Sequence, residues 1–403
     1  MARAKGKAVL QRKLNAFDVT NLVIGSIIGA DVYVATGLSA QLVGPSSLVI
    51  WVLAGVMAMV IAISFAYCVM LMPRVGGPYA YVREVSTPFL GFEVGWGLLL
   101  AEWFSLAVFP VAFATYFASL VPGIDAFGIV LLKAFFIIFV IVTNVVSVKA
   151  AGRTNDILTI VKILPLVLII VGGLAFFLYN PTVLAGNMTP FVTGDSAAFG
   201  TALILVFWAY AGFELATIPA NDVDNPEHTI PKAIVFGMLF VIAFYLLTNF
   251  VVVGAVGTTA LSGTSTPLIL TTQTIFSGDL GVLMVAVVGI GALFSILGAD
   301  ESGTIGTSRL AYAMSLDGLL PKSFAKLHPR YGTPYVALIV LCSLAFVVSV
   351  FGGLAALINS SVFLLAFVYL ATCLSAIRLE KKNPAAAGRL HLKILIPVLG
   401  AAF

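Results

Sequence analysis

The chain has 403 residues, of which 61% are hydrophobic and 9% are charged, and its mean hydropathy is +1.12. This composition excludes an ordinary soluble domain and is typical of a polytopic membrane protein. The net charge of +4 does not indicate nucleic acid, because the basic residues lie in loops beside apolar stretches, where lipid head groups are the expected partners. We therefore expect the lipid bilayer and a small-molecule substrate as partners, with no nucleic acid.

Apolar stretches of membrane length recur along the chain. A span needs about 20 residues, and on that rule the sequence predicts an all-α fold with ten spans and the start of an eleventh. We expect a cytoplasmic tail at 1–14, a ten-helix transport core at 15–379, and a cytoplasmic loop with a partial eleventh helix at 380–403. The ten spans are expected near residues 16–36, 46–72, 88–120, 127–148, 155–178, 198–220, 232–257, 280–315, 334–352 and 354–378.

The lysines and arginines predict the orientation. All of the 21 except Lys133 and Lys162 fall in the tail and in alternate loops, and basic loops face the cytoplasm. The expected location is the plasma membrane, with several passes and a cytoplasmic N-terminus. Cys68, Cys342 and Cys373 lie in apolar stretches and provide neither a disulfide framework nor a metal-ligand spacing.

Two spans contain glycines that weaken a helix. The first contains Gly25 and Gly29, and the sixth contains Gly212 followed by Glu214. In lipid, backbone freed from its helix survives only where it lines a protein cavity or water. The free N–H and C=O groups at such breaks can bind the two ends of a zwitterion. Breaks in the first and sixth helices predict inverted five-helix halves at about 15–180 and 196–379; alternatively, the glycines only allow close helix packing.

Four sequence blocks resemble those of the amino acid-polyamine-organocation (APC) superfamily of permeases. They are Gly25-x-x-x-Gly29-Ala30, Pro73-x-x-Gly76-Gly77-x-Tyr79-x-Tyr81, Gly212-Phe213-Glu214 with Asn225-Pro226 and Ile230-Pro231, and Ser308-Arg309-Leu310 through Asp317-Gly318 to Pro321. The resemblance implies the 5+5 inverted-repeat core of the sodium/leucine-transporter fold, with helices one and six broken, and transport by alternating access without a cofactor.

The same resemblance implies a substrate site at the two breaks. Backbone N–H groups of the first break would bind the substrate carboxylate, and carbonyl groups of the sixth would bind its ammonium group. Trp208 and Tyr210 form an aromatic wall or gate, or else only pack against neighbouring helices. The implied positions are Ile28, Gly29, Ala30 and Asp31 in the first helix, and Phe207, Trp208, Tyr210, Ala211 and Gly212 in the sixth.

Asp31 departs from the family pattern, in which glycine or serine is common at this place. A carboxylate here would repel the substrate carboxylate. Three interpretations stay open: Asp31 caps the second half of the first helix, it is the counter-ion of an amine substrate that lacks a carboxylate, or it titrates during transport.

Lys162 is predicted to lie near the middle of the bilayer, nine residues after Arg153. A lysine at that depth is costly and indicates a function. It coincides with a lysine of some proton-coupled relatives, so we expect it to hold helices one, five and eight together and to release them when it loses its proton. The alternative is a permanent structural ion pair.

Acidic residues outnumber this lysine within the predicted spans. An excess of acids fits a proton relay or a cationic substrate, and it also fits side chains that bond to freed backbone. Adjacent Asp300 and Glu301 point about 100° apart and cannot both face one site. We expect no metal site, and the sequence favours proton coupling over sodium coupling because the turn from Ser295 to Gly298 offers one hydroxyl. The proton-coupling candidates are Lys162, Glu102, Glu214, Asp300 and Glu301.

The sequence therefore predicts a proton-coupled secondary transporter of amino acids. The alternative is a transporter of polyamines or other organic amines on the same fold. A channel or membrane enzyme is a remote alternative, because no nucleophile–base pair, phosphate loop or histidine-rich motif is present. The sequence leaves open the preferred side chain, the choice between uptake and exchange, and the oligomeric state.

Overall fold

The computed structural model describes residues 14–74, 76–146, 151–218, 220, 223–384 and 394–403, and it leaves the side chains of 151–160 undescribed. The predicted tail at 1–14 therefore lies almost wholly outside the described residues. Within them the secondary structure is helical, apart from one isolated β-bridge between Leu14 and Val223.

The elements follow one another as α-helices and short 3-10 helices. In chain order they are α1 (Ala16–Ile27), α2 (Ala30–Val43), η1 (Gly44–Ser46), α3 (Ser47–Leu71), α4 (Pro78–Val85), α5 (Pro88–Leu120), α6 (Ala126–Val146), α7 (Ala151–Tyr179), α8 (Pro181–Asn187), α9 (Ser196–Trp208), η2 (Phe213–Thr217), α10 (Pro226–Val256), α11 (Thr258–Leu261), α12 (Pro267–Ile275), α13 (Gly278–Leu316), η4 (Lys322–Ala325), α14 (Tyr335–Phe351), α15 (Leu354–Lys382) and α17 (Leu395–Ala402).

Membrane-length helices account for most of the chain. Eight helical stretches in the described part are long and apolar enough to cross a membrane, and Ala16–Ile27 and Tyr335–Phe351 are shorter apolar helices. Within the described residues each of the ten predicted spans lies mainly on helices, with interruptions in the first and the sixth, so the chain is an all-α polytopic membrane protein. The first span extends to Val43 rather than to 36, with Gly37 packed against the ring of Pro267.

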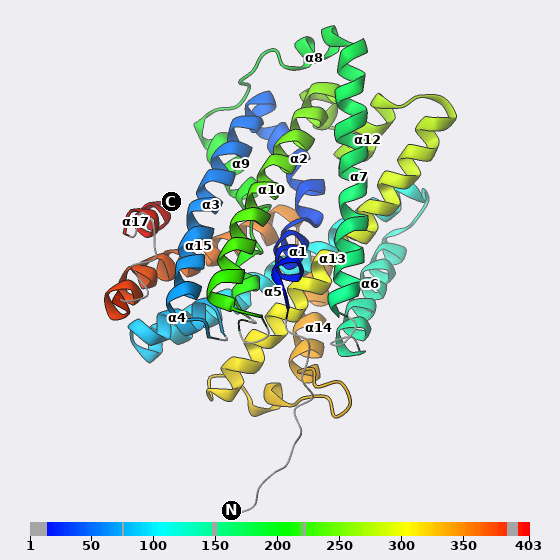
Figure 1. Ribbon diagram of the computed structural model, residues 1–403. Helices are drawn as coiled ribbons and strands as arrows, with labels where there is room; N and C mark the ends of the chain where they lie inside the picture. The colour runs from blue at the N-terminus through cyan, green and yellow to red at the C-terminus, as the bar shows by residue number, and fades with distance from the viewer. Residues whose placement is uncertain (1–13, 75, 147–150, 219, 221–222, 385–393) are drawn as a thin grey trace, which may run out of the picture.

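Helices α1 and α2 lie in the middle of the bundle (Figure 1). Helix α1 packs against α7, α10 and α13, while α2 packs against α9. The two interrupted segments of the chain, α1–α2 and α9–η2, therefore meet inside the protein. Helix α17, where the chain ends, lies at the outside against α3 and α15 (Figure 1). The inverted relation of the two halves stays a prediction.

Short helix α4 connects α3 to α5 and is tied to two other helix ends by charged side chains. Arg83 forms an ion pair with Asp317 at the end of α13 and donates a hydrogen bond of 2.6 Å to the Tyr79 hydroxyl. Burial and the hydrogen bond to Asp317 raise the pKa of Tyr79 to about 12. Glu84 forms an ion pair with Lys382 of α15, and the hydrogen bond from that ammonium group lowers the pKa of Glu84.

Candidate functional site

The first helix is interrupted at Ile28 and Gly29. Helix α1 ends at Ile27, Ile28 is extended with φ −75° and ψ 106°, and Gly29 is the N-cap of α2 without any side-chain cap. The carbonyl of Ile27 accepts a hydrogen bond of 3.0 Å from the Tyr245 hydroxyl. A buried tyrosine thus satisfies one of the carbonyls that the end of α1 leaves free.

Gly29 lets two other helices approach the break closely. A Cβ atom at this position would lie 2.4 Å from Cβ of Ala299 on α13, 3.1 Å from the Phe109 ring of α5 and 3.1 Å from Oδ2 of Asp31. Atoms at such separations overlap, so only glycine fits here. Ile28 and Ala30, on either side, are fully buried.

The sixth predicted helix is interrupted between Trp208 and Phe213. Helix α9 ends at Trp208, and Gly212 has φ +118°, a conformation that side chains with a Cβ rarely adopt. Glu214 Oε2 accepts the Gly212 N–H at 3.0 Å, and Ser26 Oγ donates to the Gly212 carbonyl at 3.0 Å. Both backbone groups of Gly212 are therefore held by side chains, one of them from α1.

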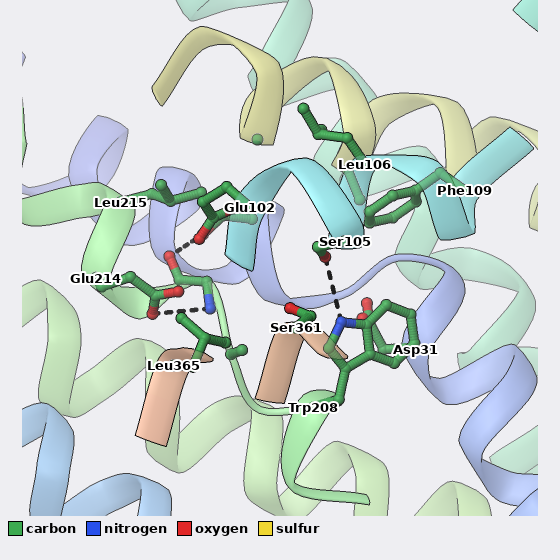
Figure 2. Close-up of a pocket in the computed structure, with 15 residues that line it drawn as sticks. Asp31, Glu102, Ser105, Leu106, Phe109, Trp208, Glu214, Leu215, Ser361 and Leu365 are labelled. Carbon is green, nitrogen blue, oxygen red and sulfur yellow. Dashed lines mark hydrogen bonds between the residues drawn. The ribbon is translucent and has the colours of Figure 1, made fainter. Parts of the chain in front are cut away.

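A cavity opens between the two breaks (Figure 2). Its polar lining consists of three carboxyl groups, three serine hydroxyls and one indole. Among the residues that the structure describes, no lysine, arginine or histidine lines it. The indole Nε1 of Trp208 donates to Ser105 Oγ at 3.2 Å, which fixes the ring. The lining residues are Ser26, Asp31, Glu102, Ser105, Leu106, Phe109, Trp208, Ala211, Gly212, Glu214, Leu215, Ala299, Gly303, Ser361 and Leu365.

The acidic residues lie in two groups. In the view of Figure 2, Glu102 and Glu214 lie on one side of Ser361, and Asp31 lies on the other beside Trp208. The carboxyl groups of Glu102 and Glu214 interact directly with each other. Oδ2 of Asp31, Oε1 of Glu214 and the hydroxyl of Ser361 are buried without a hydrogen bond of normal geometry in the described part of the chain. Such atoms can accept hydrogen bonds from a ligand or water.

Lys162 reaches the first break from α7. Its side chain is fully buried, and the ammonium group donates a hydrogen bond to the carbonyl of Gly25. The carboxyl groups of Asp31 and Glu301 lie within electrostatic range of it. Lys162 therefore connects α7, α1 and α13 close to the point where α1 ends.

Three of the predicted site residues point elsewhere. Tyr210 donates to the Trp51 carbonyl at 3.0 Å and packs with Trp51 and Tyr245, so it does not line the cavity. Phe207 packs against Tyr369 at a ring distance of 6.1 Å. Asp300 faces Cys342 of α14 instead of Lys162.

Several residues that line the cavity were not predicted from the sequence. Ser26 lies within the glycine-rich stretch of the first span, and that position could have predicted its place at the break. Ser105 and Ser361 are ordinary serines of apolar helices, and only the fold brings them to the breaks. Among the residues that the structure describes, no three His, Cys, Asp or Glu side chains gather as metal ligands would.

Known proteins match this chain along nearly its whole length. The family described as amino acid permease matches residues 14–403. The branched-chain amino acid permease of Bacillus subtilis is 29% identical over 84% of this chain and 74% of its own length. The methylthioribose transporter of the same bacterium is 28% identical over 99% and 88%, and the human cystine/glutamate transporter is 31% identical over 88% and 71%. The chain belongs to the amino acid permease family of the APC superfamily.

Proposed function

We propose that this protein is a proton-coupled secondary transporter that moves amino acids across the plasma membrane by alternating access. The observation that carries the proposal is the buried Lys162 ammonium group, which bonds to α1 beside a cavity built from two helix breaks. The printed names of its relatives include transporters of branched-chain amino acids and of cystine and glutamate.

The cavity provides groups for both ends of an amino acid. Backbone N–H groups at the start of α2 attract a carboxylate, because the positive end of the helix dipole lies there. Carbonyl groups at the end of α9 and the carboxyl groups of the cavity attract an ammonium group. The Trp208 ring lines the same space and offers a flat apolar face to the substrate side chain.

Lys162 offers a way to couple a proton to movement. Lys162 is fully buried, and the Asp31 and Glu301 carboxyl groups lie in its range, so we propose that its charge depends on theirs. A neutral amine binds the Gly25 carbonyl less strongly than an ammonium group does. Loss of the proton therefore frees α1 from α7, which supports release of substrate on the inner side.

The proposal includes a membrane arrangement that follows from the sequence. The core at 15–379 would consist of inverted halves at about 15–180 and 196–379, with α4 and the basic loops on the cytoplasmic side. Sodium is the less favoured coupling ion because Ser295 supplies the single side-chain hydroxyl in its turn of α13. No cofactor and no covalent chemistry are part of the proposal.

A second candidate function is transport of an organic amine. It is favoured by the lining of the cavity, in which three carboxyl groups and no basic side chain are found. One relative bears the name methylthioribose transporter, so the names of this chain's relatives are not confined to amino acids. Both candidates share the cavity and differ in whether the substrate has a carboxylate.

Counterflow in proteoliposomes tests the proposal. Vesicles loaded with unlabelled solute would receive labelled alanine, leucine, lysine or putrescine, with no gradient, with an imposed pH gradient, or with an imposed sodium gradient. The proposal expects exchange of an amino acid and its accumulation with the pH gradient. Movement of putrescine alone would favour the second candidate, and accumulation driven by sodium alone would contradict proton coupling.

A further inference from the structure

The carboxyl group of Asp31 occupies the place where an amino acid carboxylate would dock. Asp31 is the second residue of α2, and its side chain is 5% exposed. Oδ2 lies 3.1 Å from the point where a Cβ of Gly29 would stand, directly at the helix break. The same Oδ2 is buried without a hydrogen bond of normal geometry in the described part of the chain, although the backbone N–H groups of Gly29 and Asp31 lie within range of the carboxyl group. Asp31 also lines the cavity.

Side chains of two other helices crowd Gly29 at the break. Ala299 and Phe109 approach Gly29 so closely that a Cβ would lie 2.4 Å and 3.1 Å from them. A substrate carboxylate that approaches the N–H groups of the break therefore comes directly beside the Asp31 carboxyl group. Two ionised carboxylates in one buried place repel each other strongly, and such pairs share a proton instead.

The charged groups around Asp31 do not compensate for an additional negative charge. Lys162 of α7 is the ammonium group in range of Asp31, and it already faces Glu301 of α13. Glu102 of α5 and the Tyr245 hydroxyl of α10 also lie within electrostatic range of Asp31. An incoming carboxylate would thus join three acidic side chains that share the ammonium group of Lys162. A buried charge without a partner is neutralised by a proton.

We propose that Asp31 takes up the proton that allows a substrate carboxylate to dock at the break of the first helix. The proton enters with the amino acid, is shared by the two carboxyl groups, and leaves when the carboxylate leaves. An amine that lacks a carboxylate needs no such proton, because it pairs with ionised Asp31. Asp31 is thereby a specificity-determining residue, and this inference rests on the proposed amino acid transport.

Matched pairs of ligands test the proposal on the purified full-length protein. Binding of leucine and leucinol, and of threonine and threoninol, would be measured by calorimetry between about pH 5 and pH 8. Each amino alcohol keeps the ammonium group and the side chain but has no carboxylate. If one proton is taken up with each carboxylate, the Kd of the amino acid rises up to tenfold for each unit by which the pH increases. Over the same increase in pH, the Kd of the amino alcohol stays level or falls.

Variants assign the proton to Asp31. Asp31→Asn should bind the amino acid with a Kd that does not change with pH, and it should bind the amino alcohol more weakly than the wild type does. Asp279→Asn is the matched control, because Asp279 also lies in the first turn of a helix, α13, but is exposed. It should keep both wild-type pH profiles.

The outcomes separate this inference from the proposed function. A wild-type amino acid Kd that is independent of pH would overturn the role of Asp31, and so would an Asp31→Asn protein that keeps the wild-type slope. Binding of the amino alcohols alone would show a permanent amine counter-ion and would overturn the inference as well. Failure to bind either the amino acids or the amino alcohols would instead refute the proposed function. If Asp31→Asn does not fold, a wild-type amino acid Kd that is independent of pH still overturns the inference.

Discussion

Replacing Gly212 by alanine should separate the two helix breaks. Gly212 has φ +118°, and a Cβ at this position would lie 2.7 Å from the carbonyl oxygen of Ser26 and 3.0 Å from its carbonyl carbon. Both are backbone atoms of α1, so no side-chain rotation relieves the contact. The chain would have to move α1 and the sixth-helix break apart.

The cost can be worked out from the contacts that this movement breaks. A residue with a Cβ in such a backbone conformation is strained by about 1–3 kcal/mol. The hydrogen bonds from Ser26 Oγ to the Gly212 carbonyl and from the Gly212 N–H to Glu214 contribute about 1 kcal/mol each. We expect a loss of about 3–5 kcal/mol in the free energy of unfolding, together with a weakening of substrate binding.

Gly200→Ala is the matched control for this experiment. Gly200 lies on the same helix, α9, and a Cβ there would have nothing within 4 Å. Alanine favours a helix interior over glycine by about 1 kcal/mol, so this variant should be as stable as the wild type or more stable. Unfolding in detergent measures the loss of stability, and calorimetry with an amino acid measures the weakening of substrate binding. A Gly212→Ala protein that matches Gly200→Ala in both would refute the reasoning.

Three further predictions concern the helices around the site. A double-mutant cycle of Arg83→Gln and Asp317→Asn, read by thermal unfolding, should give a coupling of about 0.2–1 kcal/mol because both side chains are partly exposed; a coupling above about 2 kcal/mol would contradict that exposed setting. The pKa of Glu84 is lowered by its ion pair, so the stability that this pair contributes should be present above pH 4.5 and lost as the pH falls below it. Lys382→Ala should reduce that loss, because Arg74 still pairs with Glu84 at 3.3 Å, and an unchanged acid profile would argue against the pair. Gly291→Ala places a Cβ 2.1 Å from the ring of Pro165, which lies one turn after Lys162 on α7. The resulting shift of α7 should reduce proton-driven uptake about tenfold, equal to about 1.4 kcal/mol. Uptake at the wild-type level would show that α7 tolerates the shift.

The sequence was sufficient for the helices and for the positions of the breaks. A bilayer requires long apolar stretches, and glycines such as Gly29 and Gly212 mark the points where the backbone leaves the helix. The sequence also predicted that Lys162 lies within an apolar helix, and the structure has it on α7 with its side chain fully buried; its depth in the bilayer stays a prediction. These features depend on local composition, and the sequence records local composition directly.

Side-chain directions and distant partners did not follow from the sequence. Tyr210 lies in the break that follows the end of α9 at Trp208, and its hydroxyl bonds to the Trp51 carbonyl, so its ring turns away from the space that Trp208 lines. Ser361 reaches the cavity from α15, far along the chain, and nothing in its neighbourhood indicates that contact. The partners of Asp31 depend on how α5, α7 and α10 pack, and packing is a property of the whole fold.

The central claim is that Lys162 links proton movement to the substrate cavity, and one measurement tests it most directly. Proton-driven accumulation and gradient-free counterflow would be compared in proteoliposomes of the wild type, Lys162→Met and Lys133→Met. Lys133 is the matched control, because it is also buried and bonds to a backbone carbonyl, that of Ser349 at 2.6 Å, but lies on α6. We expect Lys162→Met to keep counterflow and lose accumulation, because Asp31 without its neighbouring ammonium group keeps its proton through the cycle. Lys133→Met should keep both. Accumulation by Lys162→Met at the wild-type level would contradict the account.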